Sequence, residues 1–143
     1  MMDAGRWPSG ESRFWRGLSL SFTIQTSQTS RPVKKTTFPT PQDAETAFYE
    51  ALEAGNLDAM MEVWAEDEEI VCVHPGGERL VGYDAVRSSW AQIAESGQKL
   101  KIHLSDQTVM NGMMITVHSL HEHIYAEGEQ RTAVPFAVTN IYL

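Results

Sequence analysis

The spacing of apolar and polar residues divides the chain into an irregular start and a regular remainder. In the first forty residues, Ser, Thr, Gly, Pro and Arg alternate with isolated aromatic residues, and neither a helical nor a strand period persists. Residues 1–39 are therefore predicted to be a disordered or poorly ordered leader. Residues 40–143 show helical and then strand periods, which predicts one folded domain.

Three helices are predicted in the first half of this domain. A helix start at Thr40 is followed by apolar residues at i, i+3, i+4, i+7 and i+8, and Gly55 favours a left-handed stop. Asn56 can cap a second helix with the same spacing, so the two helices are expected to form a hairpin. A third helix is expected over residues 84–95.

Strands dominate the second half. A short β-branched strand over residues 70–74 runs into a Pro-Gly-Gly turn, and from residue 99 the apolar period is two. This period predicts three long strands, over residues 99–110, 113–126 and 131–143, and the first two are joined at an Asn-Gly turn. The order predicts an α+β fold, with helices on one face of an antiparallel sheet.

Composition and charge narrow the possible environments and partners. No apolar stretch approaches the roughly 18 to 20 residues that span a bilayer, and the single cysteine, Cys72, excludes an internal disulfide. Hydroxyl residues interrupt residues 17–24, so a secretory signal is not favoured and a cytoplasmic location is expected. Residues 1–41 hold six basic against two acidic groups, whereas the remainder holds five against seventeen. An acidic domain repels phosphate backbones, so neither nucleic acid nor membrane is an expected partner.

Four segments of the domain together resemble a known family. They are residues 48–58 (FYEALEAGNLD), 64–67 (WAED), 73–77 (VHPGG) and 82–86 (GYDAV). Their order and spacing resemble the SnoaL-like branch of the nuclear transport factor 2-like superfamily, the group of ketosteroid isomerase homologues. The resemblance implies a cone-shaped barrel, a cystatin-like roll in which a curved antiparallel sheet wraps around N-terminal helices. Members include isomerases, cyclases, dehydratases, hydrolases, small-molecule binders and dimeric scaffolds, so fold alone does not select a function.

The resemblance directs attention first to His74. Isomerase-like members carry an aspartate base just before a Pro-containing turn, and His74 stands at that position. An imidazole can abstract protons near neutral pH, or it can simply close the turn with a hydrogen bond. The resemblance also implies two hydrogen-bond donors, a tyrosine and a carboxylic acid, but neither is present at the corresponding position. The position of the tyrosine is occupied by Phe48, with Tyr49 one residue later, and the position of the carboxylic acid lies near Ala137. A steroid-type isomerase mechanism is therefore not expected.

The densest polar cluster lies on the predicted second long strand. Alternation places His121 and His123 on one face, which we expect to line a pocket, and places His118 and Glu122 on the other face. His121 and His123 could bind a metal with His74 as a third ligand. The acid that would complete the set points away and the family is typically metal-free, so no metal or cofactor is predicted.

The other side chains of interest have simpler interpretations. Trp64 and Trp90 lie on apolar helical stripes and are expected to be core or pocket wall. Cys72 is expected to be a buried structural thiol. The methionines are expected to form a pliable apolar lining of the pocket, namely Met60, Met61, Met110, Met113 and Met114.

Family members usually end in a further strand after the one predicted over residues 131–143. If that strand is missing, residues 136–143 form an exposed apolar edge, which a neighbouring subunit could cover. A homodimer is therefore expected.

Three functions remain open. The preferred one is binding of a small organic molecule in an apolar pocket whose candidate ligand-binding residues are Tyr49, Trp64, His74, Trp90, His121 and His123. The alternative is an isomerase, cyclase or dehydratase with His74 or His121 as general acid or base. A second alternative is a homodimeric structural module without a ligand.

Overall fold

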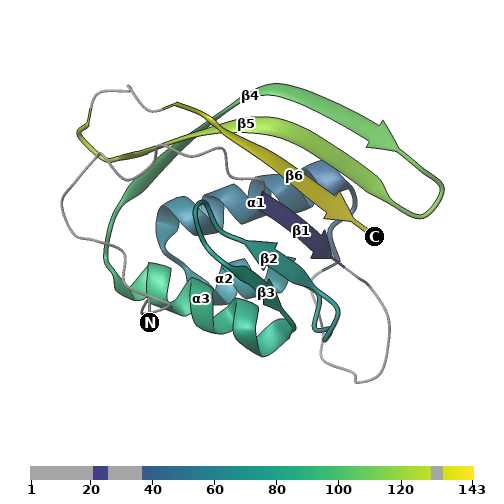
Figure 1. Ribbon diagram of the computed structural model, residues 1–143, viewed down its shortest axis with the longest axis horizontal. Helices are drawn as coiled ribbons and strands as arrows, with labels where there is room; N and C mark the ends of the chain where they lie inside the picture. Colours follow the sequence, from purple (N-terminus) through teal and green to yellow (C-terminus); the bar gives the residue numbers. More distant parts are fainter. Residues whose placement is uncertain (1–20, 26–36, 130–133) are drawn as a thin grey trace.

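The computed structural model describes residues 21–25, 37–129 and 134–143 (Figure 1). The elements follow one another as β1 (Ser21–Gln25), α1 (Pro41–Ala54), α2 (Leu57–Val63), β2 (Val71–Val73), β3 (Arg79–Val81), α3 (Tyr83–Glu95), β4 (Leu100–Asn111), β5 (Thr116–Ala126) and β6 (Phe136–Tyr142). The predicted α+β class is confirmed, and so are the three helices and the three long strands.

Local chemistry sets the ends of the first two helices. The Oγ1 atom of Thr40 accepts a hydrogen bond from the backbone N–H of Asp43 at 3.1 Å, which caps the N-terminus of α1. Gly55 adopts a φ of 62°, which ends α1 in the left-handed conformation. The side chain of Asn56 then accepts the N–H of Ala59 at 3.1 Å and caps α2. The predicted helical hairpin is confirmed.

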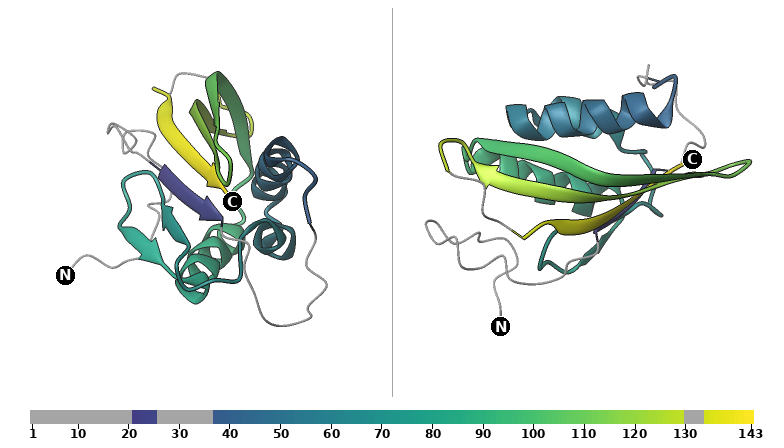
Figure 2. Two further views of the ribbon diagram at one scale, coloured as in Figure 1. Left: turned by 90° about the vertical axis from the view of Figure 1, so that its right-hand side faces the viewer. Right: turned by 90° about the horizontal axis from the view of Figure 1, so that it is seen from above.

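The strands form two sheets. The larger has the strand order β1-β6-β5-β4, and β2 pairs with β3 in a smaller antiparallel sheet. Figure 2 shows the larger sheet curving over the helices on one of its faces without closing into a barrel. This architecture is consistent with the predicted cone. β3 is not predictable from the sequence pattern, because a three-residue strand is too short to show a period of two.

The sequence suggested that the edge of β6 is exposed, but in the structure β1 covers it. β1 pairs with β6 in parallel, from Ser21 opposite Val138 to Gln25 opposite Tyr142, and it also lies beside β2 (Figure 1). A strand in this position covers the edge that the resemblance left open. It comes from the segment predicted to be a disordered leader, of which residues 1–20 and 26–36 lie outside the described part of the chain.

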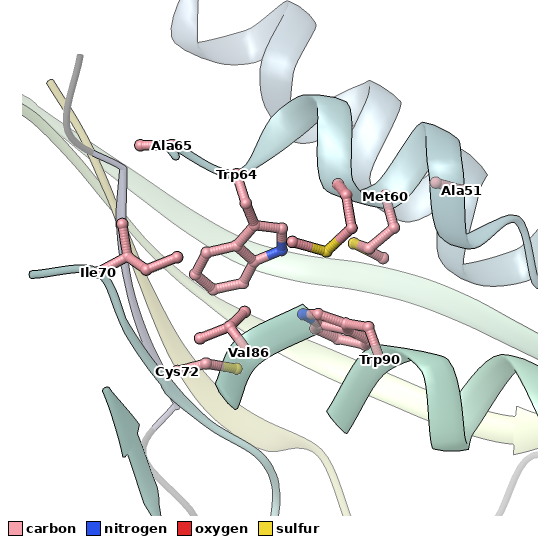
Figure 3. Packing of buried hydrophobic residues seen from close by; sticks show 9 residues of the cluster. Ala51, Met60, Trp64, Ala65, Ile70, Cys72, Val86 and Trp90 are labelled. Carbon is pink, nitrogen blue, oxygen red and sulfur yellow. The ribbon is translucent and has the colours of Figure 1, made fainter. Parts of the chain in front are cut away.

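The main hydrophobic core lies between the three helices and β2 (Figure 3). The side chains of Trp64, Ile70 and Val86 are completely buried, and Trp90 is nearly so. Of the two expectations for these tryptophans, core or pocket wall, the structure supports the core. None of the described helices is long and apolar enough to cross a lipid bilayer.

The methionines divide between the core and the surface. Met60 and Met61 are buried, whereas Met110, Met113 and Met114 lie exposed at the end of the β4–β5 hairpin. The expected pocket lining is therefore wrong for these last three. The hairpin extends beyond the helices (Figures 1 and 2), so none of the other described elements covers the apolar residues near its turn.

Candidate functional site

The inner face of β5 carries the buried polar residues of the sheet. His118, Leu120 and Glu122 alternate along the strand and face the helices, with exposed fractions of 0%, 2% and 7%. The prediction placed His118 and Glu122 on the face opposite the pocket, and this orientation is wrong. Both faces of β5 carry apolar and imidazole side chains, so the strand period is visible in the sequence but the buried face is not.

His121 and His123 therefore lie on the outer face of the sheet. The Nδ1 atom of His121 lies 2.9 Å from a carboxylate oxygen of the exposed Asp106, and the Nε2 atom of His123 lies 3.1 Å from the hydroxyl of Ser105. They are separated from the interior by the sheet itself. Their ligand-binding role, and the catalytic role of His121, stay predictions, and the site described below does not depend on them.

A buried carboxylate organises the first half of the interior site, which we term the Glu45 cluster: Glu45, Gln107, His118, Asn140 and Tyr142. Glu45 lies on the inner face of α1, and its side chain is bonded to the four others. The Nδ1 atom of His118 is 2.7 Å from Glu45 Oε2, and the Asn140 amide and the Tyr142 hydroxyl donate to the same oxygen at 3.4 and 3.3 Å. The Gln107 amide donates to the other oxygen. Strands β4, β5 and β6 thus all converge on one acid.

These contacts define the tautomer of His118. A carboxylate only accepts hydrogen bonds, so Nδ1 carries a proton and donates it to Glu45. The Nε2 atom faces the side-chain amide nitrogen of Gln42, which is a donor, at 3.5 Å. Nε2 is therefore the acceptor in its contact with Gln42. The ring also packs against the ring of Tyr142, with centroids 4.9 Å apart.

A second acid lies further along the same face of β5. The hydroxyl of Tyr49, one helical turn after Glu45 on α1, donates a hydrogen bond to Glu122. Burial raises the pKa of Glu122 to about 7; the hydrogen bond from Tyr49 opposes this shift, and the charge of Glu45 adds to it. Burial, together with the charge of Glu122, likewise raises the pKa of Tyr49. Tyr49 remains neutral, and Glu122 exchanges its proton near neutral pH.

The Tyr49–Glu122 pair corrects one conclusion from the sequence. A tyrosine and a carboxylic acid were not expected to meet, because the resemblance aligned the tyrosine with Phe48 and the acid with Ala137. In the structure Tyr49 is buried and faces the sheet, and the acid comes from a different strand. Phe48 and Tyr49 are about 100° apart on the helix, and both are turned inward: Phe48 packs against the apolar core while Tyr49 faces the sheet.

Aromatic rings separate this polar row from the apolar core. Phe48 packs edge-on against Tyr49, Trp64 and Trp90, with ring centroids 5.0, 6.4 and 5.4 Å apart. The indole N–H of Trp90 is buried and has no hydrogen-bond acceptor among the described residues. In Figure 3 this nitrogen turns toward Val86, inside the fold. A buried donor without an acceptor costs about 1–3 kcal/mol, so a bound acceptor atom would stabilise this position.

His74 lies beside the aromatic wall, at the end of β2. Its ring packs edge-on against Trp90, with centroids 4.6 Å apart, and its Nε2 atom lies 3.0 Å from the hydroxyl of Ser89. That hydroxyl donates to the carbonyl of Val86, so it accepts from Nε2–H of His74. Burial lowers the pKa of His74 to about 4, which keeps the ring neutral at pH 7. These contacts support a structural role, and the predicted role of His74 as a base stays a prediction.

Cys72 belongs to the same region. Its sulfur lies 3.8 Å from Nε2 of His74, and burial raises the pKa of the thiol to about 12, with a further contribution from the charge of Glu122. The thiol is therefore protonated at pH 7. This agrees with a structural cysteine rather than a nucleophile.

The interior is filled more completely than the sequence suggested. A surface hollow found among the described residues lies at the turn between α1 and α2, against Trp90 and Ile93, and holds no more than a single water molecule. None of the predicted histidines lines it. The described part of the chain also contains no group of three or more His, Cys, Asp or Glu side chains that could hold a metal ion.

Three residues of the site were not predicted from the sequence, namely Glu45, Asn140 and Tyr142. Glu45 lies four positions before the predicted candidate Tyr49 on the helix, and Asn140 and Tyr142 continue the buried alternation of β6 that starts at Phe136 and Val138. The sequence did contain a signal for these residues, because they are polar positions within two apolar stripes. A polar residue on a buried face normally has a hydrogen-bond partner, so such positions indicate a buried polar cluster.

Comparison with known proteins assigns this chain to a family. The sequence profile of a SnoaL-like domain matches residues 42–143. The chain belongs to the SnoaL-like domain family. Strand β1 lies outside the region that this SnoaL-like family profile covers. No curated protein matches the chain.

Solved structures agree with the SnoaL-like assignment. A Thiobacillus denitrificans protein assigned as a calcium/calmodulin-dependent protein kinase type II association domain is 25% identical, with a TM-score of 0.63, covering 75% of this chain and 97% of that one. A Streptomyces avermitilis protein of the nuclear transport factor 2-like family, assigned as a dehydratase, is 21% identical, with a TM-score of 0.55 and coverage of 69% and 90%. A Nostoc punctiforme protein of unknown function with a cystatin-like fold is 8% identical, with a TM-score of 0.52 and coverage of 71% and 86%. The last two likenesses establish the fold alone.

Proposed function

We propose that this SnoaL-like domain binds a small, neutral and mostly apolar organic molecule through an acceptor oxygen. The observation that carries the proposal is the buried Tyr49–Glu122 pair, in which a carboxyl group holds its proton near neutral pH. The phenol of Tyr49 already donates its proton to Glu122, so the pair has one free donor, the O–H of the protonated carboxyl group, which suits an oxygen atom that accepts a hydrogen bond.

The surroundings of the pair support this ligand class. The rings of Phe48, Trp64 and Trp90 offer apolar contact, and the buried Trp90 N–H, turned toward Val86, is a further donor that lacks an acceptor among the described residues. All lysine and arginine residues within the described ranges are exposed, so no interior cation is available there to neutralise an anionic ligand. Because the interior is closely packed, binding requires rotation of a covering side chain.

Acetophenone, a neutral aromatic ketone, is a suitable probe. We expect it to shift the NMR signals of Tyr49, Glu122 and the Trp90 indole in the full-length chain. Tyr49→Phe and Glu122→Leu should each weaken binding by about three- to tenfold, the equivalent of one hydrogen bond. His103→Gln, on an exposed strand position, is the matched control. If millimolar concentrations of acetophenone and of related ketones and lactones leave all three signals in place, the proposal is wrong.

We propose, second, that copies of the chain associate through the β4–β5 hairpin. Its end exposes Met110, Met113 and Met114, with Ile115 next to them. A cluster of large apolar side chains on a surface is typical of an interaction site. The Thiobacillus denitrificans relative is assigned as an association domain, which agrees with self-association as a use of this fold.

A further inference from the structure

The outer face of the large sheet brings two histidines together across neighbouring strands. His103 on β4 and His123 on β5 are directly opposite each other in the antiparallel pairing, and directly opposite residues share one face of a sheet. Their ring centroids are 5.7 Å apart, with 55° between the ring planes. The helices cover the other face (Figure 2), so His103 is exposed and His123 is half-buried.

We propose that His103 and His123 bind one divalent transition-metal ion of the zinc, nickel and copper class between the two strands. Imidazole nitrogen is a preferred ligand of these ions. Water completes the coordination shell, because the described residues contain no group of three or more His, Cys, Asp or Glu side chains that could hold a metal. The site goes beyond the proposed function, since the sheet separates it from the interior.

The spacing of the two rings suits a shared ion. Zinc binds imidazole nitrogen at about 2.1 Å in tetrahedral geometry, which places the centres of two bound rings about 5 Å apart. The observed 5.7 Å has to close by less than about 1 Å, which rotation of the exposed His103 side chain can supply. Both ligands lie on paired strands of one hairpin, so the backbone needs no ordering when the ion binds.

A serine sets the tautomer of His123. The hydroxyl of Ser105 donates to a carboxylate oxygen of Asp106 at 3.4 Å, so it accepts a hydrogen bond from Nε2–H of His123 at 3.1 Å. A neutral His123 then carries its lone pair on Nδ1, the nitrogen that we assign to the metal. Histidine ligands typically donate their second N–H to an oxygen, which fixes the ring. Ser105 is thus a positioning residue.

A bulge in β4 lies behind this serine. The pairing with β5 shifts between Ser105 and Thr108, and Asp106 has a φ of 54°, which is uncommon for a residue other than glycine. The Asp106 carboxylate lies on the outer face, where it is 2.9 Å from Nδ1 of His121. His121 shares the face and the strand of His123, but its ring is held by Asp106 and is not assigned to the metal.

The charges around the pair favour a cation. Residues 42–143 hold five basic against seventeen acidic groups, and a field of this sign concentrates cations at the surface. Lys101 precedes His103 by two residues on the strand. Its ammonium group lies 3.4 Å from a carboxylate oxygen of Glu53 on α1, which compensates its charge.

Titration of the untagged full-length chain with zinc chloride tests the site. We expect one equivalent of Zn²⁺ to bind with a dissociation constant of about 100 µM or lower, and to shift the imidazole NMR signals of His103 and His123 together. The signals of the completely buried His118 should stay in place. If about 1 mM Zn²⁺ leaves the signals of His103 and His123 unshifted, the inference is wrong.

Matched variants assign the ligands by calorimetry. His103→Gln and His123→Gln should each weaken zinc binding at least about tenfold, because each removes one of the two ligand nitrogens. His121→Gln, on the same face, is the control and should change the affinity by less than about twofold. A loss in His121→Gln as large as in His103→Gln overturns the cross-strand assignment. Equal binding by all four proteins shows an adventitious ion only and overturns the site.

The positioning role of Ser105 has its own measurement. In the unmodified, zinc-free chain at pH 8, nitrogen NMR should find the proton of His123 on Nε2, and a proton on Nδ1 instead overturns the inference. Ser105→Ala should lower the fraction of this tautomer and weaken zinc binding by at least about threefold, the equivalent of a weak hydrogen bond. An unchanged tautomer and an unchanged affinity in Ser105→Ala contradict the role of this serine.

Discussion

Among the buried polar side chains of the interior, Glu122 is the most informative. A carboxyl group 7% exposed, facing another acid and hydrogen-bonded by Tyr49, is costly to ionise. Burial of such a group without a cationic partner does not favour folding. Its presence on the inner face of β5 is better explained by what its proton can do for a ligand than by packing.

This acid predicts a specific pH dependence of stability. The pKa of Glu122 is raised from 4.5 to about 7 in the folded chain, so between these values the folded state holds a proton that the unfolded state has released. Stability therefore falls as pH rises from about 4.5 to 7, by up to about 3 kcal/mol. Glu122→Gln should remove this fall, as measured by urea unfolding at pH 5 and pH 8. The exposed Glu95→Gln is the control, and identical pH dependence in all three proteins would contradict the pKa assignment.

At the scale of elements, the helix ends predicted from the sequence are confirmed, whereas the edge strand β1 was not predicted. Thr40, Gly55 and Asn56 act within a few residues of their own positions, so their effect is visible in any sequence that contains them. β1 instead depends on β6, which lies more than a hundred residues later in the chain. It pairs with the edge of β6, the strand that carries Asn140 and Tyr142. In this way it supports the strand on which these two members of the Glu45 cluster lie.

Proline substitutions in β1 test this pairing. In a strand, adjacent backbone N–H groups point in opposite directions, so only one of Phe22 and Thr23 directs its N–H toward β6. We expect one of Phe22→Pro and Thr23→Pro to lower the free energy of unfolding by at least about 1 kcal/mol more than the other. Thermal unfolding of the full-length chain measures both. Two equal and negligible effects would show that β1 does not pair with β6 in solution.

At the scale of the whole molecule, the two faces of the large sheet have different surroundings. The inner face is covered by helices, whereas the β4–β5 hairpin extends past them with Met113 fully exposed and Met114 81% exposed. Among the described residues, nothing covers these apolar side chains at the end of the hairpin, and a cluster of this kind is typical of an interaction site. Association of two copies would remove them from water.

The hairpin predicts how the oligomeric state responds to mutation. Light scattering at micromolar concentration should find a dimer or larger assembly, because two buried methionine side chains stabilise an interface by several kcal/mol. The double variant Met113→Ser, Met114→Ser should raise the dissociation constant by at least about tenfold. Glu95→Gln, on the exposed face of α3, should leave it unchanged. A monomeric wild-type chain would contradict the prediction.

The sequence by itself determined the α+β class, the three helices, the three long strands and the family. These depend on periods and capping residues, which are properties of neighbours in the chain. It also placed Trp64 and Trp90 on apolar helical stripes, as core or pocket wall. Only the tertiary structure decided which face of β5 is buried. As a result, His118 and Glu122 face the interior, where the sequence had predicted His121 and His123. A strand with similar side chains on both faces is equally stable facing either way until helices cover one of them, so this choice is made by long-range packing and leaves no local trace.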